Sequence, residues 1–315
     1  MSTVTGSSDP SAAMTSTEPT SVDSPEDLQR WVLAALLDRP RYEVLPVPGT
    51  ADQVASHVPK ALTVTVTASP RRGLEPTLEL TEVLARGGYS TVPHLAARLV
   101  HDEHHLAEVL ARLDEAGVRD AFVVAGDGKS PVGGFSDSLQ LLSAIDRLRG
   151  PGSGLEPMCI GVSGYPEGHP LLATGQLDRA LLAKQSSGSY VVTQMCFDAN
   201  AVLGWIGHAR ELGVGLPVHV GIAGAVDRIK LLRVAARIGV GTSLRFLRKH
   251  QGGARLLRPS GYRPDRLLEQ LAASDVVPGK PAVAGLHVYT LGDVATTERW
   301  RQEMLDELTD GDRHG

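Results

Sequence analysis

The chain shows two spacings of apolar residues, one typical of buried strands and one typical of amphipathic helices. The first 24 residues show neither, because half of them are Ser or Thr and hardly any has a large apolar side chain. Such a segment cannot bury enough surface to offset its ordering entropy, so residues 1–24 are predicted to be a disordered tail. Order is predicted to begin at Ser24-Pro25-Glu26-Asp27, where an N-cap serine precedes a proline and two acids. The helix that starts there ends near residue 39 and has an apolar face of Leu28, Trp31, Val32 and Leu36.

From residue 41 onwards, short apolar runs and helical patterns alternate eight times. The runs predict strands at 42–45, 62–67, 89–95, 121–125, 158–162, 190–193, 217–222 and 284–291. The helical patterns predict helices at 51–57, 77–85, 103–116, 138–149, 177–184, 199–212, 226–238, 242–250, 264–274 and 294–308.

Eight strands that are each followed by a helix indicate parallel pairing and an α/β fold, a (β/α)8 TIM barrel with an extra N-terminal helix. Residues 25–315 are then expected to form a single catalytic domain. An open, doubly wound sheet is the main alternative. It is less favoured because the rhythm is regular and no G-x-G-x-x-G motif follows the first strand. In such a barrel, the site lies at the carboxyl ends of the strands.

Composition and charge narrow the function classes. Of the 315 residues, 42% are hydrophobic and 21% charged, which is ordinary for a globular protein. The net charge of −5 offers no electrostatic footprint for nucleic acid or an anionic membrane. No apolar run approaches the ~20 residues of a membrane helix, and no signal peptide is recognisable, which predicts a cytoplasmic protein. Two cysteines, Cys159 and Cys196, lie in apolar runs and are expected to be buried core thiols.

The predicted strand ends are rich in polar side chains. The stretch 161–170 ends the fifth strand and places Tyr165 directly before Pro166, and Glu167 and His169 between Pro166 and Pro170. Prolines restrict φ and glycines allow uncommon backbone angles, so this turn can hold polar groups in one place, although a rigid turn without chemistry is the alternative. The other ends carry Glu43, Thr67, His94, Asp127, Gln194, Tyr289 and Thr290, and the seventh carries Gly221 and Gly224, where a flat ligand could approach the backbone.

This mixture of side chains indicates a type of chemistry. No Ser, Cys or Lys is clearly paired with a base, which argues against covalent catalysis. A carboxylate and an amide presented together suit the donor and acceptor edge of a pterin or a similar heterocycle.

At these strand ends the sequence resembles the methylenetetrahydrofolate reductase family. Six segments follow in family order between about residues 41 and 292, and their coincidence is specific although each is weak alone. They are Tyr42-Glu43-Val44-Leu45-Pro46, Pro93-His94-Leu95, Gly126-Asp127, Tyr165-Pro166-Glu167-Gly168-His169-Pro170, Thr193-Gln194-Met195-Cys196-Phe197-Asp198 and His287-Val288-Tyr289-Thr290-Leu291.

The resemblance implies a barrel that reduces 5,10-methylenetetrahydrofolate to 5-methyltetrahydrofolate with NADH or NADPH and so feeds methionine synthesis. It assigns Glu43 as the acid that helps to open the folate ring. Asp127 is assigned to pterin binding and to the cationic iminium, with Gln194 and Tyr289 also on the substrate. An acid near the leaving nitrogen must hold a proton, so Glu43 is expected to be partly desolvated.

The same resemblance bears on the cofactor, because the family usually holds FAD. It places Thr67, His94, Tyr165, His169 and Lys184 on the cofactor side. The family's Arg before Gly-Asp is Ala125 here, the loop after the second strand is Ala68-Ser69-Pro70-Arg71-Arg72, and Asp178 is one position from the usual acid. Each lost charge-assisted contact would remove ~1.5–3 kcal/mol. We therefore expect FAD to be absent or weakly bound, with Arg71 and Arg72 available for dinucleotide phosphates or the folate glutamate tail.

Other motifs and functions compete with this interpretation. Residues 126–130 resemble a P-loop but have Val123 where the motif requires glycine, and His101-Asp102-Glu103-His104-His105 lacks the spacing of a metal motif, so no metal site is predicted. Residues 239–243 suit either phosphate binding or a helix cap.

Two alternative functions compete with a reductase. The first is a folate-binding or partner subunit without catalysis, and the second is a different flavin-dependent barrel oxidoreductase, such as a proline-dehydrogenase relative. The oligomeric state stays open.

Overall fold

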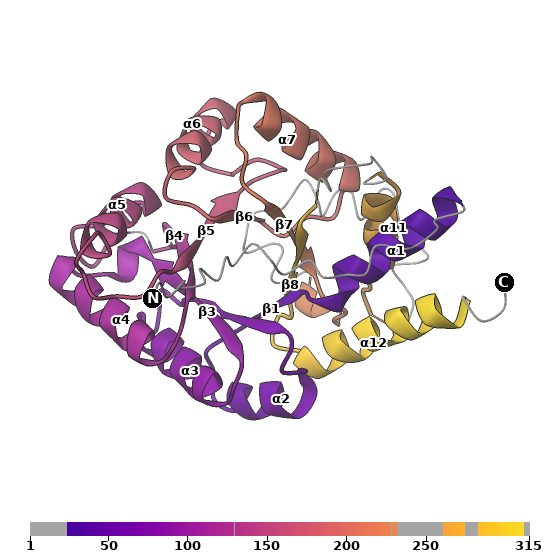
Figure 1. Ribbon diagram of the computed structural model, residues 1–315, viewed down its shortest axis with the longest axis horizontal. Coiled ribbons are helices and arrows are strands. Elements are labelled where there is room, and N and C mark those ends of the chain that lie inside the picture. Colours follow the sequence, from indigo (N-terminus) through magenta and orange to yellow (C-terminus); the bar gives the residue numbers. More distant parts are fainter. Residues whose placement is uncertain (1–23, 129, 228, 232–260, 275–282, 312–315) are drawn as a thin grey trace, which may run out of the picture.

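The computed structural model describes residues 24–128, 130–227, 229–231, 261–274 and 283–311. Its eight strands are all parallel and form one closed barrel, in which each strand pairs with the next and β8 pairs with β1 (Figure 1). The predicted (β/α)8 barrel is confirmed, and the open sheet is excluded because the ring has no edge strand. The strands are β1 (Arg41–Val44), β2 (Thr63–Val66), β3 (Ser90–Ala96), β4 (Asp120–Val124), β5 (Cys159–Gly164), β6 (Tyr190–Thr193), β7 (Val218–Ala223) and β8 (Gly285–Tyr289).

Helices surround the barrel on the outside (Figure 1). They are α1 (Pro25–Asp38), α2 (Thr50–His57), α3 (Glu75–Arg86), the 3-10 helix η1 (Ala97–Leu99), α4 (Glu103–Glu115), α5 (Ser138–Leu148), α6 (Thr174–Lys184), α7 (Ala199–Glu211), α11 (Asp265–Ser274) and α12 (Val294–Gly311). Most predicted bounds agree within two residues, while α6 begins three residues earlier than expected. Almost all of the predicted tail, most of the two predicted helices between 226 and 250, and the 239–243 motif lie outside the described residues.

The extra N-terminal helix α1 begins as its sequence predicts. The Ser24 hydroxyl accepts a hydrogen bond from the Asp27 amide at 3.1 Å, and Pro25 occupies the first turn, where no amide donor is needed. The helix packs against α11 and α12 on the outside of the barrel. Its buried residues Leu33, Leu36 and Leu37 join the main apolar core between the strands and the helices.

A buried charged network fastens α12 to the start of the barrel. Glu298 and Arg301 on α12 are 7% and 5% exposed. Their side chains form two hydrogen bonds of 2.9 Å, and the Tyr42 hydroxyl of β1 donates to Glu298 at 2.8 Å. The Arg301 guanidinium also donates to the Leu37 carbonyl at 2.8 Å. Every polar atom in these contacts has a partner, which a buried ion pair requires to be tolerated.

The inside of the barrel is more polar than a packed hydrophobic core. Val92, Phe122, Tyr190 and Val192 form a small apolar cluster there. Next to it, the Arg41 guanidinium lies 2.9 Å from Asp120 and 4.1 Å from the centre of the Tyr190 ring, and the Tyr190 hydroxyl donates to Asp120 at 2.7 Å. Hydrogen-bonded polar side chains therefore fill part of the barrel interior.

The cysteine prediction needs one correction. Both thiols are free and Cys196 is buried, but Cys159 is only half-buried. Cys159 begins β5, where it lies beside the small apolar cluster inside the barrel. None of the helices in the described residues is long and apolar enough to cross a membrane.

Candidate active site

Three strands bring a carboxylate and two imidazoles together inside the barrel. Glu43 is on β1, His94 on β3 and His287 on β8. The Glu43 carboxylate Oε2 lies 3.1 Å from His287 Nε2 and 3.7 Å from His94 Nε2. The side chain of Glu43 is 14% exposed, that of His94 6% and that of His287 1%. We call these three residues the Glu43 cluster.

Burial decides the protonation of the Glu43 cluster. Loss of solvent raises the pKa of the Glu43 carboxyl, and the proximity of His94 only partly opposes that shift. Burial lowers the pKa of His94 to about 4 and that of His287 to about 3. Both imidazoles are therefore neutral at pH 7, and among the described residues the ion pairs of Glu43 are with these two histidines alone. A carboxyl in this environment can retain a proton, as predicted for Glu43.

The backbone around Glu43 is fixed by the neighbouring strand. The Glu43 carbonyl accepts hydrogen bonds from the Thr290 hydroxyl at 2.6 Å and the Thr290 amide at 3.3 Å. The imidazoles are held by ring packing. The His94 ring meets Phe122 edge-on at 4.8 Å, and the His287 ring meets Tyr289 at 4.9 Å. The cluster is thus held on rigid elements, which is the arrangement that a precise site requires.

A row of polar groups leads from the Glu43 cluster to the loops after β4 and β5. Burial raises the pKa of the Tyr289 hydroxyl, and the nearby Glu43, Cys196 and Tyr165 raise it further. The Tyr165 ring meets His169 edge-on at 5.2 Å. Asp127 is exposed. Burial raises the pKa of Tyr165 and the Asp127 charge adds to that shift, whereas burial lowers the pKa of His169 and the same charge opposes it. The structure therefore brings five predicted residues, Glu43, Tyr289, Tyr165, His169 and Asp127, to one end of the barrel.

Gln194 and Thr67 occupy the ends of two further strands. Gln194 follows β6 and is partly exposed. Its backbone N–H donates to the Gly164 carbonyl at 2.8 Å. Thr67 follows β2, and its amide donates to the Val44 carbonyl of β1 at 3.0 Å. The Thr67 carbonyl accepts from the Thr77 hydroxyl at 3.0 Å, which anchors α3 to the end of the strand. Both residues lie at the predicted rim.

Lys184 is the one predicted cofactor residue on a helix. It is 6% exposed, and its ammonium lies 3.3 Å from the Ser163 hydroxyl of β5. The same hydroxyl hydrogen-bonds Tyr165 and so links Lys184 to the rim. Burial lowers the pKa of the ammonium from 10.5 to about 8, with Asp137 opposing the shift.

This shift predicts how stability depends on pH. The folded pKa of about 8 is below the unfolded value of 10.5, so the unfolded chain binds more protons between those values and stability rises with pH across that window. Below pH 8 the cost of the buried charge is fully present. We expect Lys184→Met to raise the free energy of unfolding at pH 7 by ~2–3 kcal/mol, with the advantage shrinking by pH 10.

Urea unfolding at pH 7, 8.5 and 10 measures this effect. Lys60→Met is the comparison variant, because it removes an exposed lysine, whose ammonium contacts the Gly87 carbonyl and the Tyr89 ring at the surface. Equal pH slopes for wild type and Lys184→Met between pH 8 and 10 would contradict the assignment.

His287 is the residue of the Glu43 cluster that the sequence interpretation did not assign. It begins one of the segments that resemble the reductase family, two positions before Tyr289, and residues two apart on a strand share a face. That spacing, combined with the substrate-binding role assigned to Tyr289, was the available signal. The sequence could not show that Glu43 and His287, 244 positions apart, are hydrogen-bonded.

The glycines of the seventh strand end do not serve the role predicted for them. A Cβ on Gly221 would lie 2.3 Å from the Thr193 carbonyl oxygen, and one on Gly224 would lie 2.5 Å from the Thr297 hydroxyl. Both spaces are filled by the protein itself. These residues are glycines because β7 packs closely on its neighbours, and a ligand is not needed to explain them.

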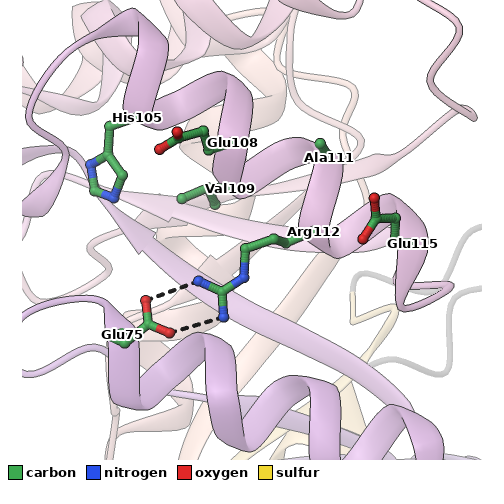
Figure 2. Close-up of a pocket in the computed structure, with 7 residues that line it drawn as sticks. All are labelled: Glu75, His105, Glu108, Val109, Ala111, Arg112 and Glu115. Atoms are coloured by element: carbon green, nitrogen blue, oxygen red, sulfur yellow. Dashed lines mark hydrogen bonds and ion pairs between the residues drawn. The ribbon is translucent and has the colours of Figure 1, made fainter.

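The histidine-rich segment before α4 behaves as expected for a helix start. The Asp102 carboxylate accepts from the His105 amide at 2.8 Å and caps α4. A shallow hollow of about 460 Å³ lies between this helix and α3, on the outer layer of the barrel (Figure 2). There, Arg112 forms two bonds of 2.9 Å with Glu75 and one of 2.8 Å with Glu82. The Arg112 charge is already paired, so the hollow is a solvated ion-pair surface.

Comparison with known proteins decides the family. A family model described as methylenetetrahydrofolate reductase matches residues 48–242, well over half of the chain. The chain belongs to the methylenetetrahydrofolate reductase family. The match includes the segments with His94, Asp127, Tyr165 and Gln194, and it begins after Glu43 and ends before His287. The placement of those two residues beside His94 is thus an observation of the structure itself.

Individual relatives agree with the family but cover little of their own length. Methylenetetrahydrofolate reductase 2 of Saccharomyces cerevisiae is 31% identical over 33% of this chain and 17% of its own. Methylenetetrahydrofolate reductase (NADH) 1 of Arabidopsis thaliana is 32% identical over 33% of this chain and 18% of its own. The chain thus aligns with less than a fifth of each of these relatives. Among solved structures, dihydropteroate synthase from Thermus thermophilus aligns with a TM-score of 0.43 at 15% identity, over 87% of this chain and 94% of that one.

Proposed function

We propose that residues 25–315 form one catalytic domain that reduces 5,10-methylenetetrahydrofolate to 5-methyltetrahydrofolate, with NADH or NADPH as the hydride donor. The observation that carries this proposal is Glu43, a largely buried carboxyl with a raised pKa at the end of the barrel where the rim residues lie. Family membership supports the substrate class, and the name of the Arabidopsis relative supports a nicotinamide donor. The product would supply the methyl group for methionine synthesis in the cytoplasm.

The role proposed for Glu43 is that of general acid. Its proton goes to N10 of the folate while the bond between N10 and the bridging methylene breaks, which leaves a cationic iminium on N5. The nicotinamide supplies a hydride to the former bridging methylene carbon. One proton and one hydride are thus consumed, and a methyl group is formed on N5. His287 is a positioning residue, because its Nε2 lies 3.1 Å from the carboxyl and its ring cannot move freely at 1% exposure.

Asp127 and Gln194 are proposed to bind the pterin. A carboxylate close to the iminium stabilises positive charge that is greater in the transition state than in the substrate. Asp127 suits this role because it is exposed at the active end and its charge already reaches Tyr165 and His169. The side-chain amide of Gln194 can both donate and accept hydrogen bonds, which matches the donors and acceptors on the edge of a pterin. Tyr289, between Glu43 and Tyr165 in the row of polar groups, would complete the substrate side.

We propose that the hydride passes directly from the nicotinamide, with FAD absent or weakly bound. In the family resemblance, Ala125 replaces an arginine on the cofactor side. In this structure the Ala125 carbonyl accepts from the Arg98 amide at 3.1 Å. The Arg98 guanidinium in turn donates to the carbonyls of Gly128 at 2.7 Å and Ser136 at 2.9 Å. The Arg98 cation of η1 therefore holds the loop between β4 and α5, and no step is assigned to a flavin.

The remaining rim residues are proposed to face the dinucleotide. They are Thr67, His94, Tyr165, His169 and Lys184. The rings among them can stack on a nicotinamide, the Lys184 ammonium can pair with phosphate, and the Thr67 hydroxyl can hydrogen-bond. Arg71 and Arg72, both exposed on the loop after β2, are candidates for the phosphates or for the folate glutamate tail. The Arg72 guanidinium already donates to the Pro46 carbonyl at 3.1 Å, so Arg71 is the better placed of the two.

The test combines a spectrum with an assay. The purified protein should show no flavin absorbance between the near ultraviolet and the blue. It should oxidise NADH or NADPH only when methylenetetrahydrofolate is present, and added FAD should not increase the rate. No oxidation of either nucleotide, with or without FAD, would contradict the proposed function. Folate binding without turnover would favour the non-catalytic subunit, and a yellow protein inert to folates would favour another flavin-dependent oxidoreductase.

A further inference from the structure

The Glu43 cluster has the donor set of a transition-metal site. One ligand atom from each of Glu43, His94 and His287 lies within 4.8 Å of the other two. Within the described part of the chain, it is the only group of three or more His, Cys, Asp or Glu side chains that could hold an ion in this way. The family resemblance assigns no metal to this site, and the sequence predicted none.

A second observation points to a ligand in the same place. His94 Nε2 is buried and has no hydrogen-bond partner among the described residues. Its side chain is 6% exposed, and this nitrogen is the atom that lies 3.7 Å from the Glu43 carboxylate. Buried polar atoms normally find a partner. A cation between His94 and Glu43 would give His94 Nε2 that partner and would bind Glu43 at the same time.

The geometry is close to what a small divalent ion requires. With bonds of 2.0–2.2 Å, the ligand atoms of a tetrahedral Zn²⁺ site lie about 3.3 Å apart. The two distances from Glu43 Oε2, 3.1 Å to His287 and 3.7 Å to His94, lie on either side of that value. The two imidazole nitrogens, at most 4.8 Å apart, would have to approach by no more than ~1.5 Å. Glu43 is 14% exposed, which leaves a route for the ion and a position for water.

The chemistry of the donors selects the class of ion. Two imidazoles and one carboxylate suit Zn²⁺, Co²⁺ or Fe²⁺, whereas Mg²⁺ and Ca²⁺ prefer oxygen ligands. His287 Nδ1 has no partner among the described residues, so the ring lacks the outer hydrogen bond that most metal-bound histidines make. The loss of such a hydrogen bond lowers the affinity of a site for its metal about 10–100-fold. The site should accordingly be of moderate affinity and reversible.

We propose that Glu43, His94 and His287 bind a divalent transition-metal ion of the Zn²⁺ class, and that this ion competes with catalysis. The binding is independent of the proposed function. The competition rests on it, because an ion on Glu43 Oε2 removes the proton that the proposed reduction needs. The bound ion is thus a reversible inhibitor of the enzyme and has no part in the reaction.

Co²⁺ is the probe for binding, measured on the tag-free chain after EDTA treatment and dialysis. Titration should give saturable visible absorption from one bound Co²⁺ per chain, which Zn²⁺ removes and excess Mg²⁺ does not. His94→Gln and His287→Gln should each weaken binding at least ~100-fold, since losing a ligand costs more than losing an outer hydrogen bond. His219→Gln is the matched control, because His219 is another histidine of the barrel interior with an unpartnered Nδ1, outside the cluster.

The outcomes separate binding from inhibition. If Co²⁺ gives no bound spectrum, or if both cluster variants bind like wild type, the metal site is refuted. Glu43→Gln, which conserves side-chain shape, replaces either histidine variant that fails to fold by circular dichroism. If the proposed function holds, Zn²⁺ should abolish methylenetetrahydrofolate reduction and EDTA should restore it. Bound Co²⁺ in a protein that never reduces folate would retain the metal site and refute the proposed function, whereas full activity with the site occupied would refute the competition.

Discussion

Glu43→Gln should lower kcat for methylenetetrahydrofolate reduction by about 10²–10⁴-fold, the range expected when a general acid is removed. The glutamine side chain has nearly the same shape and can still hydrogen-bond His287, but it has no acidic proton for N10. Because the substrate contacts of the other rim residues remain, KM should change little and the loss should fall on kcat. Steady-state loss of NADH or NADPH absorbance measures both constants.

Two comparisons make this result specific. Glu79→Gln changes an exposed carboxylate on the outer helix α3 and should leave kcat as in the wild type. Thermal unfolding of Glu43→Gln should match the wild type to within a few degrees, which separates a chemical defect from a folding defect. A Glu43→Gln enzyme with wild-type kcat would remove Glu43 from the mechanism.

Glu298→Ala should lower the free energy of unfolding by about 3–5 kcal/mol, the usual cost of leaving one partner of a buried ion pair alone. The variant leaves the Arg301 guanidinium, 5% exposed, without the carboxylate that accepts two of its hydrogen bonds. It also leaves the Tyr42 hydroxyl of β1 without its acceptor. At ~2–4 °C per kcal/mol for a large domain, the melting temperature should fall by roughly 6–20 °C.

The same helix provides the control. Glu303 pairs with Arg263 at 2.7 Å, but those side chains are 47% and 33% exposed. Surface pairs contribute about 0–1 kcal/mol, so Glu303→Ala should unfold almost like the wild type. Urea unfolding of the two variants side by side tests the difference. A loss below 1 kcal/mol for Glu298→Ala would mean that α12 is not held to the barrel by this network.

The two predictions concern two carboxyl groups in opposite environments. Glu298 is surrounded by donors, and its partners are Arg301, Tyr42 and Gln302, so its charge is fully satisfied. Glu43 has only neutral imidazoles beside its carboxyl, and burial raises its pKa. The first arrangement stabilises a fold. The second keeps a proton available, which is why perturbed carboxyls mark candidate sites.

Much of the architecture could be predicted from the sequence alone. Strand and helix periodicities, the Ser24 cap and the turn residues are local signals, and eight regular units leave little choice but a closed parallel barrel. In such a barrel the carboxyl ends of all strands lie at one end, where the site is found. The residues at these strand ends could therefore be assigned to one site without coordinates; they are Glu43, His94, Asp127, Tyr165, Gln194 and Tyr289. Resemblance to the reductase family then supplied roles that periodicity cannot provide.

Only the tertiary structure decided which of these residues touch. The pairing of Glu43 with His287 depends on the register between β1 and β8, which the closure of the barrel determines over a separation of 244 positions. The spaces at Gly221 and Gly224 are filled by Thr193 and Thr297, whose proximity no local pattern encodes. The raised pKa of Glu43 likewise arises from solvent excluded by distant strands. Local periodicity thus determines the elements and their order, whereas contacts, burial and protonation result from long-range packing.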